Sequence, residues 1–279
     1  MKAANTNPES SSTLEISNPI STDSIPQKIG KRTDEIHLVL QGKGGVGKSF
    51  VATVLAEYFQ GKFTDLRCFD TDPVNPTFSS YKAFDAKRIP LVIDGKVNEP
   101  AFDNLLLELM EPGVSAVVDS GSTTFVALMR YLHRQDAFKN LAQFKKQVVV
   151  HSIVVGGDAM AETAAGFGRV FDSTPESTRI VLWLNQYRAP VALGGVPFVE
   201  SDGFKKMEHR VYAVIDMPES WGDLFDRDIQ EMRQLRMSFE EAIRGDARPG
   251  LDEPFNILQR QRFTLIQRDY FDKLSTYKI

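Results

Sequence analysis

Residues 42–49 of this chain, which read GKGGVGKS, carry glycines at a spacing suited to binding phosphate. Gly42 and Gly47 lie five positions apart and are followed directly by Lys48 and Ser49, which is the spacing of a phosphate-binding loop. Glycines permit the tight turn that lets backbone N–H groups face an anion. We therefore expect Lys48 to reach the β- and γ-phosphates of a nucleotide and Ser49 to hold Mg²⁺.

Acidic side chains follow two further apolar runs of the chain. The run 66–70 leads into Asp72, and the run 115–119 ends at Asp119. A carboxylate beside a γ-phosphate can orient the attacking water or hold a water on Mg²⁺. An apolar strand that ends in Asp is the pattern that positions Mg²⁺ through water. We expect Asp72 and Asp119 at the metal, with a plain Asp-Pro turn as the alternative for Asp72.

Strands and helices must bring these side chains together, and their pattern is visible in the sequence. Short runs that are apolar along most of their length suit strands covered on both faces. Stretches of helical period separate them, such as the one placing Val51, Leu55 and Tyr58 on one face after the loop. The alternation predicts an α/β fold with a doubly wound, mostly parallel sheet flanked by helices. The predicted strands are residues 36–41, 66–70, 115–119, 147–155, 180–185 and 211–215.

The first 34 residues differ in composition from the remainder. Half of them are Ser, Thr, Asn, Gln or Pro, and none is aromatic. So little apolar surface cannot offset the entropy of ordering, so we expect a disordered tail over residues 1–34. A docking arm that becomes ordered on a partner is the alternative. Residues 35–279 are expected to form one domain that ends in a helical segment.

The overall composition excludes several classes of protein. The chain has 279 residues, of which 42% are hydrophobic and 25% charged, with a net charge of −4. Its single cysteine, Cys68, excludes an internal disulfide framework and any site built from paired thiolates within one chain. No apolar run approaches the roughly 18–20 residues needed to span a bilayer. These features favour a cytoplasmic protein.

Two later segments bear on partners. Residues 191–206 are too long for a plain connection, and either a partner-binding or lid element or a surface loop would explain them. Residues 255–277 carry apolar side chains at helical spacing, which favours a core or dimer helix over one lying on a membrane surface. From Trp221 onward ten Lys and Arg meet eleven Asp and Glu, so non-specific DNA binding is possible but not favoured.

The phosphate loop carries a second lysine, Lys43, and the form KGGVGKS resembles the deviant Walker A motif of the ParA/MinD family of ATPases. The resemblance implies an ATP-dependent homodimer in which Lys43 reaches the partner's nucleotide. It also implies that Asp72 orients the attacking water and that Asn185 and Pro218 lie at the adenine. The catalytic residues would be Lys43, Lys48 and Asp72, and the metal residues Ser49, Asp72 and Asp119. The residues expected at the nucleotide are Gly42, Gly44, Gly45, Val46, Gly47, Lys48, Ser49, Phe50, Asn185 and Pro218.

Several segments from about residue 35 to the C-terminus resemble one branch of that family, the TraL conjugal-transfer proteins. They include the loop with its preceding strand, DTDPVN at residues 70–75 with YKA at 81–83, VVGG at 154–157 and WLN at 183–185. The resemblance implies an ATPase, using ATP and Mg²⁺, that acts as a slowly hydrolysing dimeric switch. It would be accessory to plasmid conjugative transfer or maintenance, with other components of that system as partners.

Three other functions remain open from the residues alone. One is a plasmid-partitioning ATPase that binds DNA non-specifically as its ATP dimer. Another is a P-loop enzyme that activates phosphate on a small molecule, with a substrate pocket built partly from residues 191–206. A third is a module that holds nucleotide without hydrolysing it, against which the acidic Asp72 and Asp119 speak.

Overall fold

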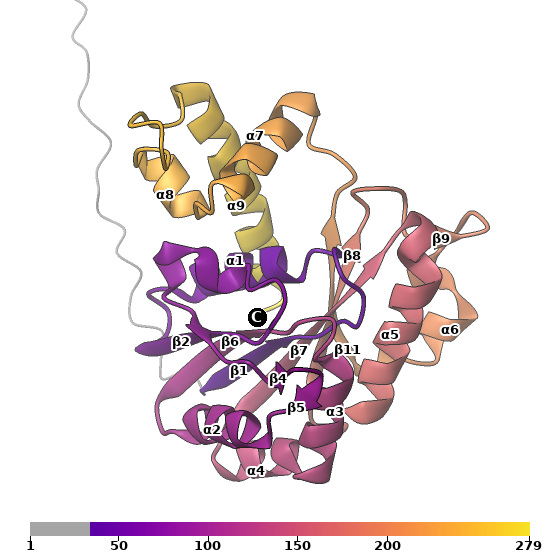
Figure 1. The fold of residues 1–279 in the computed structure, drawn as a ribbon. Helices are drawn as coiled ribbons and strands as arrows, with labels where there is room; N and C mark the ends of the chain where they lie inside the picture. Colours follow the sequence, from indigo (N-terminus) through magenta and orange to yellow (C-terminus); the bar gives the residue numbers. More distant parts are fainter. Residues whose placement is uncertain (1–33) are drawn as a thin grey trace, which may run out of the picture. The chain divides into compact units, whose positions relative to one another are not determined.

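A computed structural model describes residues 34–279 of the chain, so the tail expected over residues 1–34 lies outside the described part except for Asp34. Within the described residues, seven strands form one parallel sheet in the order β11-β8-β7-β1-β6-β2-β3. Helices cover both of its faces (Figure 1). The predicted doubly wound α/β fold is therefore confirmed.

Each of the six predicted apolar runs is a strand of this sheet, with ends that differ from the prediction by at most two residues. The sheet strands are β1 (Glu35–Val39), β2 (Asp65–Asp70), β3 (Lys87–Arg88), β6 (Val114–Asp119), β7 (Gln147–Val155), β8 (Arg179–Asn185) and β11 (Val211–Met217). Two small antiparallel hairpins lie outside it, β4 (Val92–Ile93) with β5 (Lys96–Val97) and β9 (Ala192–Leu193) with β10 (Val196–Pro197).

The helices divide between the two faces of the sheet. One face packs against α1 (Lys48–Phe59), α8 (Phe239–Arg244) and α9 (Ile257–Thr276), with α7 (Asp223–Gln234) beside them. The other face packs against α2 (Glu99–Met110), α3 (Phe125–Arg134), α4 (Ala137–Gln143) and α5 (Met160–Ser173), as Figure 1 shows. The short α6 (Asp202–Lys205) follows the second hairpin. Apolar side chains on both faces explain why the strands read as nearly continuous apolar runs.

Strand β1 lies in the middle of the sheet and shows how the two cores are filled. Ile36 and Leu38 point into the core under α2–α4, whereas Val39 belongs to the core under α1. His37 of β1 is fully buried, and its Nδ1 lies 3.0 Å from Nε2 of His151 on β7. The Trp183 indole on β8 donates to the other nitrogen of His151 at 3.1 Å. These side chains link three neighbouring strands through polar contacts inside the core.

The C-terminal helices pack onto the helix that follows the phosphate loop. Helix α9 buries Phe263, Ile266 and Leu274 in the core under α1, which matches the expectation of a core helix. Its more N-terminal Leu258 is 60% exposed, so the buried stripe starts later than the apolar pattern suggests. Within the described residues, no helix is long and apolar enough to cross a bilayer.

A buried carboxylate on α1 joins that helix to the C-terminal segment. Glu57 accepts hydrogen bonds from the backbone N–H groups of Phe239 and Glu240, at the start of α8, and from the Gln267 amide on α9. Burial raises the pKa of Glu57 to about 7, although these three donors act in the opposite direction. Helix α1 is thus held to two C-terminal helices by polar contacts as well as by apolar packing.

The long connection between β8 and β11 is a packed extension of the core. Phe198 and Phe204 of this segment are buried against Phe167 of α5. Leu193 and Val196 of the β9–β10 hairpin remain about half exposed. The segment 191–206 therefore has a fixed apolar base and an exposed hairpin.

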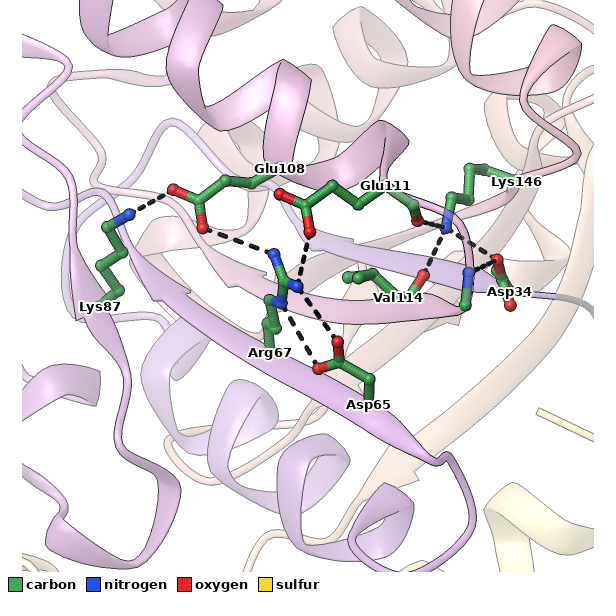
Figure 2. Close-up of polar contacts among 9 residues, drawn as sticks. Asp34, Asp65, Arg67, Lys87, Glu108, Glu111, Val114 and Lys146 are labelled. Carbon is green, nitrogen blue, oxygen red and sulfur yellow. Dashed lines mark hydrogen bonds and ion pairs between the residues drawn. The ribbon is translucent and has the colours of Figure 1, made fainter.

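Charged side chains cluster where β2, β6 and β7 begin, and we call residues Asp34, Asp65, Arg67, Lys87, Glu108, Glu111 and Lys146 the amino-edge cluster (Figure 2). The Arg67 guanidinium contacts Asp65 at 3.1 Å and Glu111 at 2.7 Å. The buried Lys146 ammonium donates to the Asp34 carboxylate at 2.8 Å and to two backbone carbonyls. The buried Lys146 and the partly exposed Arg67 are thus both satisfied by acceptors within the chain.

Candidate functional site

The phosphate loop connects the end of β1 to the start of α1 and has the backbone that its glycines allow. Gly45 and Gly47 have φ angles of 71° and 102°, in the left-handed region that disfavours side chains. Helix α1 begins at Lys48, and no side chain caps its first turn. Its N-terminal N–H groups and the loop's backbone therefore form a cradle suited to an anion.

Lys48 is buried beneath this loop, with 7% of its surface exposed. Its ammonium donates a hydrogen bond to the Lys43 carbonyl at 2.8 Å. Burial lowers the pKa of Lys48, while the nearby carboxylates of Asp119 and Asp72 act to raise it. The structure thus brings together a cation and two carboxylates that were predicted from three separate segments.

Asp119 ends β6 and is 1% exposed. Burial raises its pKa to about 7, against a hydrogen bond from Ser49 and the charge of Lys48, which favour the ionised form. Within residues 34–279, its Oδ1 atom has no hydrogen-bond partner. A buried carboxylate oxygen without a partner, beside a serine hydroxyl, is an oxygen-rich arrangement that suits Mg²⁺. Ser49 and Asp119 therefore fit the metal role expected of them.

Asp70 and Asp72 organise the segment that follows β2. The Asp70 carboxylate is fully buried and accepts from the backbone N–H groups of Asp72 and Ser79. Burial is the main reason that the pKa of Asp70 is raised. Asp72 accepts from the N–H groups of Val74 and Asn75, and both bonds go to Oδ1. One carboxylate therefore fixes the base of the segment and the other shapes its turn.

Gly121, two residues after β6, lies directly against Asp72. A Cβ at position 121 would come within 2.9 Å of the Asp72 Cα and Cγ atoms, closer than real Cβ contacts. The segment after β2 and the segment after β6 can therefore meet only because residue 121 has no side chain. This contact fixes the position of Asp72, whose charge acts on Lys48 of the loop.

Lys43 lies on the outer side of the loop. Its ammonium forms an ion pair at 2.8 Å with Glu162 of α5, and about half of each side chain is exposed. An exposed pair of this kind contributes little to stability, typically less than about 1 kcal/mol. Lys43 is thus held at the surface, away from the buried Lys48.

A cavity of about 370 Å³ opens beside the loop. Its walls include several residues predicted at the nucleotide: Lys43, Gly44, Gly45, Val46, Gly47, Phe50, Asn185 and Pro218. The Asn185 amide donates to the Val46 carbonyl at 2.9 Å, and its oxygen accepts from the Tyr187 N–H group. Asn185 therefore joins β8 to the phosphate loop at the edge of this cavity.

The cavity is also lined by residues that the sequence analysis did not single out. They follow β8 or belong to α7 and the residues before it: Tyr187, Arg188, Trp221, Asp226, Ile229, Gln230 and Arg233. Trp221 stands three residues after Pro218, and a large aromatic so close to a predicted base-contacting proline is the signal that could have indicated this wall.

The parallel sheet, the glycine loop at the end of its central strand and the helix that starts at Lys48 define a P-loop NTPase fold. No family model matches the chain. Two Escherichia coli proteins named TraL are each 35% identical to it, one over 241 and the other over 240 residues. Each match covers 86% of this chain and 97% of the relative. The chain therefore belongs to the TraL family.

The chain also has weak structural similarity to three solved structures. A MinC:MinD cell division complex from Aquifex aeolicus has a TM-score of 0.44 at 11% identity, covering 83% of this chain and 95% of that one. A Borrelia burgdorferi B31 protein assigned to plasmid partition, bound to AMPPNP, has a TM-score of 0.36 at 13% identity, covering 87% and 100%. Chloroplast FtsY from Physcomitrella patens scores 0.35 at 12% identity, covering 56% and 51%. These scores are too low to support conclusions about function.

Proposed function

We propose that this protein is a slowly hydrolysing ATP switch that dimerises on ATP and is accessory to plasmid conjugative transfer or maintenance. The observation that carries the proposal is the burial of Lys48 and Asp119 near one another under the phosphate loop, with one oxygen of Asp119 lacking a partner among residues 34–279. Membership of the TraL family supports the link to plasmid transfer. The switch would act in the cytoplasm, together with other components of the plasmid system.

ATP binding would use groups that are already in position. The N–H groups of residues 44–48 would surround the β-phosphate, and the Lys48 ammonium would exchange its bond to the Lys43 carbonyl for phosphate oxygens. The adenine would enter the cavity between Asn185 and Pro218. Mg²⁺ bound by Ser49 and Asp119 would neutralise charge on the phosphates.

Hydrolysis would rely on Asp72. Its Oδ1 holds the turn of its own segment, so Oδ2 is the oxygen that would orient the attacking water. Gly121 would keep that carboxylate close to the γ-phosphate. Orientation of that water by a single carboxylate is consistent with slow turnover.

Dimerisation would use Lys43. Its exposed ammonium is held by only one exposed partner, Glu162, so it can leave that pair and reach the nucleotide of a second copy at little energetic cost. ATP would then favour the dimer because the γ-phosphate adds contacts that exist only between two chains. Loss of the γ-phosphate would release the copies.

The test is size-exclusion chromatography with light scattering in the presence of ADP, ATP or a non-hydrolysable ATP analogue. We expect a monomer with ADP and a dimer with ATP or the analogue. Lys43→Ala should bind ATP as the wild type does and stay monomeric. A Lys43→Ala protein that dimerises normally with ATP would overturn the role of Lys43, and a wild type that binds no ATP would overturn the whole proposal.

A further inference from the structure

The side chain of Gln41 lies inside the protein immediately before the phosphate loop, and it is fully buried. Its amide nitrogen donates to the Ile153 carbonyl at 2.6 Å and to the Thr163 carbonyl at 3.1 Å. Its amide oxygen accepts from the Gly42 N–H group at 2.8 Å. Both amide hydrogens and the oxygen are therefore used, which is complete satisfaction for a buried amide.

The position of this amide interrupts the ladder between β1 and β7. Leu40 donates its N–H group to the His151 carbonyl at 2.9 Å, as parallel pairing requires. The next bond of the ladder would join the Gly42 N–H group to the Ile153 carbonyl. The Gln41 amide stands between these two groups instead, accepting from the first and donating to the second. It separates the two strands by the width of one amide where the loop leaves the sheet.

Helix α5 leaves room for the amide on its other side. A Cβ at Gly166 would lie 2.1 Å from the Gln41 Oε1 atom, so any side chain at position 166 would have to displace the Gln41 amide. Glycine in a helix interior costs roughly 1 kcal/mol relative to alanine, so local helix stability does not explain this residue. The same helix supplies the Thr163 carbonyl to Gln41 and the Glu162 carboxylate to Lys43. The loop is therefore tied to α5 at both of its sides.

We infer that Gln41 is a positioning residue for the phosphate loop, acting through Gly42 and seated in the space left by Gly166. Its amide fixes the first peptide of the loop so that the following N–H groups are arranged for phosphate before any nucleotide arrives. A loop arranged in advance loses less conformational entropy on binding. This inference rests on the proposed nucleotide binding. It attributes part of the protein's affinity for nucleotide to the loop conformation that Gln41 fixes.

The first test is Gln41→Glu, which keeps the shape of the side chain and removes both N–H donors. The buried carboxyl group has at most one O–H to donate, and only when it is protonated, so at least one of the Ile153 and Thr163 carbonyls loses its donor and the loop should lose its fixed start. We expect the dissociation constant for a fluorescent ATP analogue with Mg²⁺ to rise roughly ten-fold. The measurement is made well below the unfolding temperature of each protein, so that only folded protein is compared.

The matched control is Gln259→Glu. Gln259 is also a buried glutamine, and its amide donates to Asp228 at 3.1 Å at a place where neither residue lines the cavity. This variant should lower the unfolding temperature and leave the dissociation constant at the wild-type value. If Gln41→Glu also lowers only the unfolding temperature, Gln41 is a structural residue and the inference is wrong.

The second test uses Gly166 and stays informative even if Gln41→Glu fails to fold. Gly166→Ala should weaken nucleotide binding in the wild-type background, because its methyl group displaces the Gln41 amide. In a Gln41→Ala background the methyl group has space, so Gly166→Ala should change the dissociation constant little. Equal effects in the two backgrounds would contradict the inference. A wild type that binds no nucleotide would refute the proposed function instead, so the two failures are distinguishable.

Discussion

The carboxyl ends and the amino ends of the parallel strands both carry buried charged residues, but the two groups differ in how completely the chain supplies their polar partners. At the carboxyl ends of the strands, Lys48 and Asp119 are buried, and the Oδ1 atom of Asp119 has no partner among the described residues. At the amino ends, the buried Lys146 has a carboxylate and two carbonyls as acceptors, and Arg67 is surrounded by three carboxylates (Figure 2). The chain therefore supplies the partners of the buried cation at the amino ends, whereas one oxygen of Asp119 at the carboxyl ends is left without one among the described residues.

The pKa shifts of the carboxyl groups differ in direction between the two ends. At the amino end, burial of Asp34 is outweighed by Lys146 and the Gly113 N–H group, and the pKa of Asp34 is lowered. At the carboxyl end, burial dominates and raises the pKa of both Asp70 and Asp119. The first end gains stability from ionised carboxylates, and the second carries them at a cost that a bound cation would relieve.

The largest expected effect comes from removing the cation under the loop. Lys48→Met should weaken binding of an ATP analogue by roughly a hundred-fold or more, because a charged donor to phosphate is lost. The stability of the nucleotide-free protein should change by less than about 1 kcal/mol, since relief from burying this charge offsets the loss of its hydrogen bond to the Lys43 carbonyl. Titration calorimetry and urea unfolding check the two parts. If Lys48→Met strongly destabilises the nucleotide-free protein, Lys48 is a structural cation, and the proposed difference between the two ends of the strands is wrong.

The same substitution at the amino end should have the opposite profile. Lys146→Met leaves the Asp34 carboxylate and two carbonyls without their donor and should lower the free energy of unfolding by about 3 kcal/mol. The folded fraction should bind the ATP analogue as the wild type does, because Lys146 lies far from the cavity walls. The test measures the free energy of unfolding in urea and the dissociation constant for the ATP analogue on the same preparation of the variant. Wild-type stability would show that the amino-edge cluster is not structural.

Asp119→Asn should change the stability of the protein and its Mg²⁺-dependent binding of ATP in opposite directions. At pH 8 and without nucleotide the neutral amide avoids the cost of a buried carboxylate, so the unfolding free energy should rise, on the order of 2 kcal/mol. The dependence of ATP affinity on Mg²⁺ should be lost at the same time. The two measurements are urea unfolding and binding with and without Mg²⁺. A less stable variant would mean that Asp119 is already satisfied without a ligand.

A smaller effect concerns the dependence of stability on pH. Glu57 and Asp119 have pKa values of about 7 in the folded protein, above those of the unfolded chain, so the folded state binds more protons between about pH 4 and 7. The unfolding free energy should therefore fall as pH rises from 5.5 to 8. Glu57→Gln should reduce that fall by about 1 kcal/mol, measured by urea unfolding at both pH values. The control variant Glu176→Gln, at an exposed position, should show the same fall in unfolding free energy between pH 5.5 and 8 as the wild type. A wild-type fall in Glu57→Gln would contradict the prediction.

The strands and the phosphate loop could be predicted from the sequence because their causes are local. Apolar runs covered on both faces identify the strands, and the glycine spacing at residues 42–49 identifies the loop. The end of a parallel strand then places Asp119 near Lys48. The nucleotide contacts and the dimer stay predictions.

The remaining features depend on residues far apart in the sequence. Gln41 and Gly166 touch across 125 positions, and nothing in either segment alone indicates the contact. The part of the cavity wall that α7 forms depends on how the C-terminal helices pack. The helical periodicity of the sequence does not determine that packing. In α9, Leu258 and Leu265 fit an apolar stripe as well as Phe263 does, yet of these three residues the packing buries only Phe263.

The central place of β1 in the sheet also constrains the order of events during synthesis. Strand β1 pairs with β6, which ends at residue 119, and with β7, which ends at residue 155. A ribosome must therefore release more than half of the 279 residues before the phosphate loop has both neighbours. Helix α9, which packs against α1, is translated later still. A nascent chain should thus acquire affinity for nucleotide only near the end of translation, well after its phosphate-binding residues have been made.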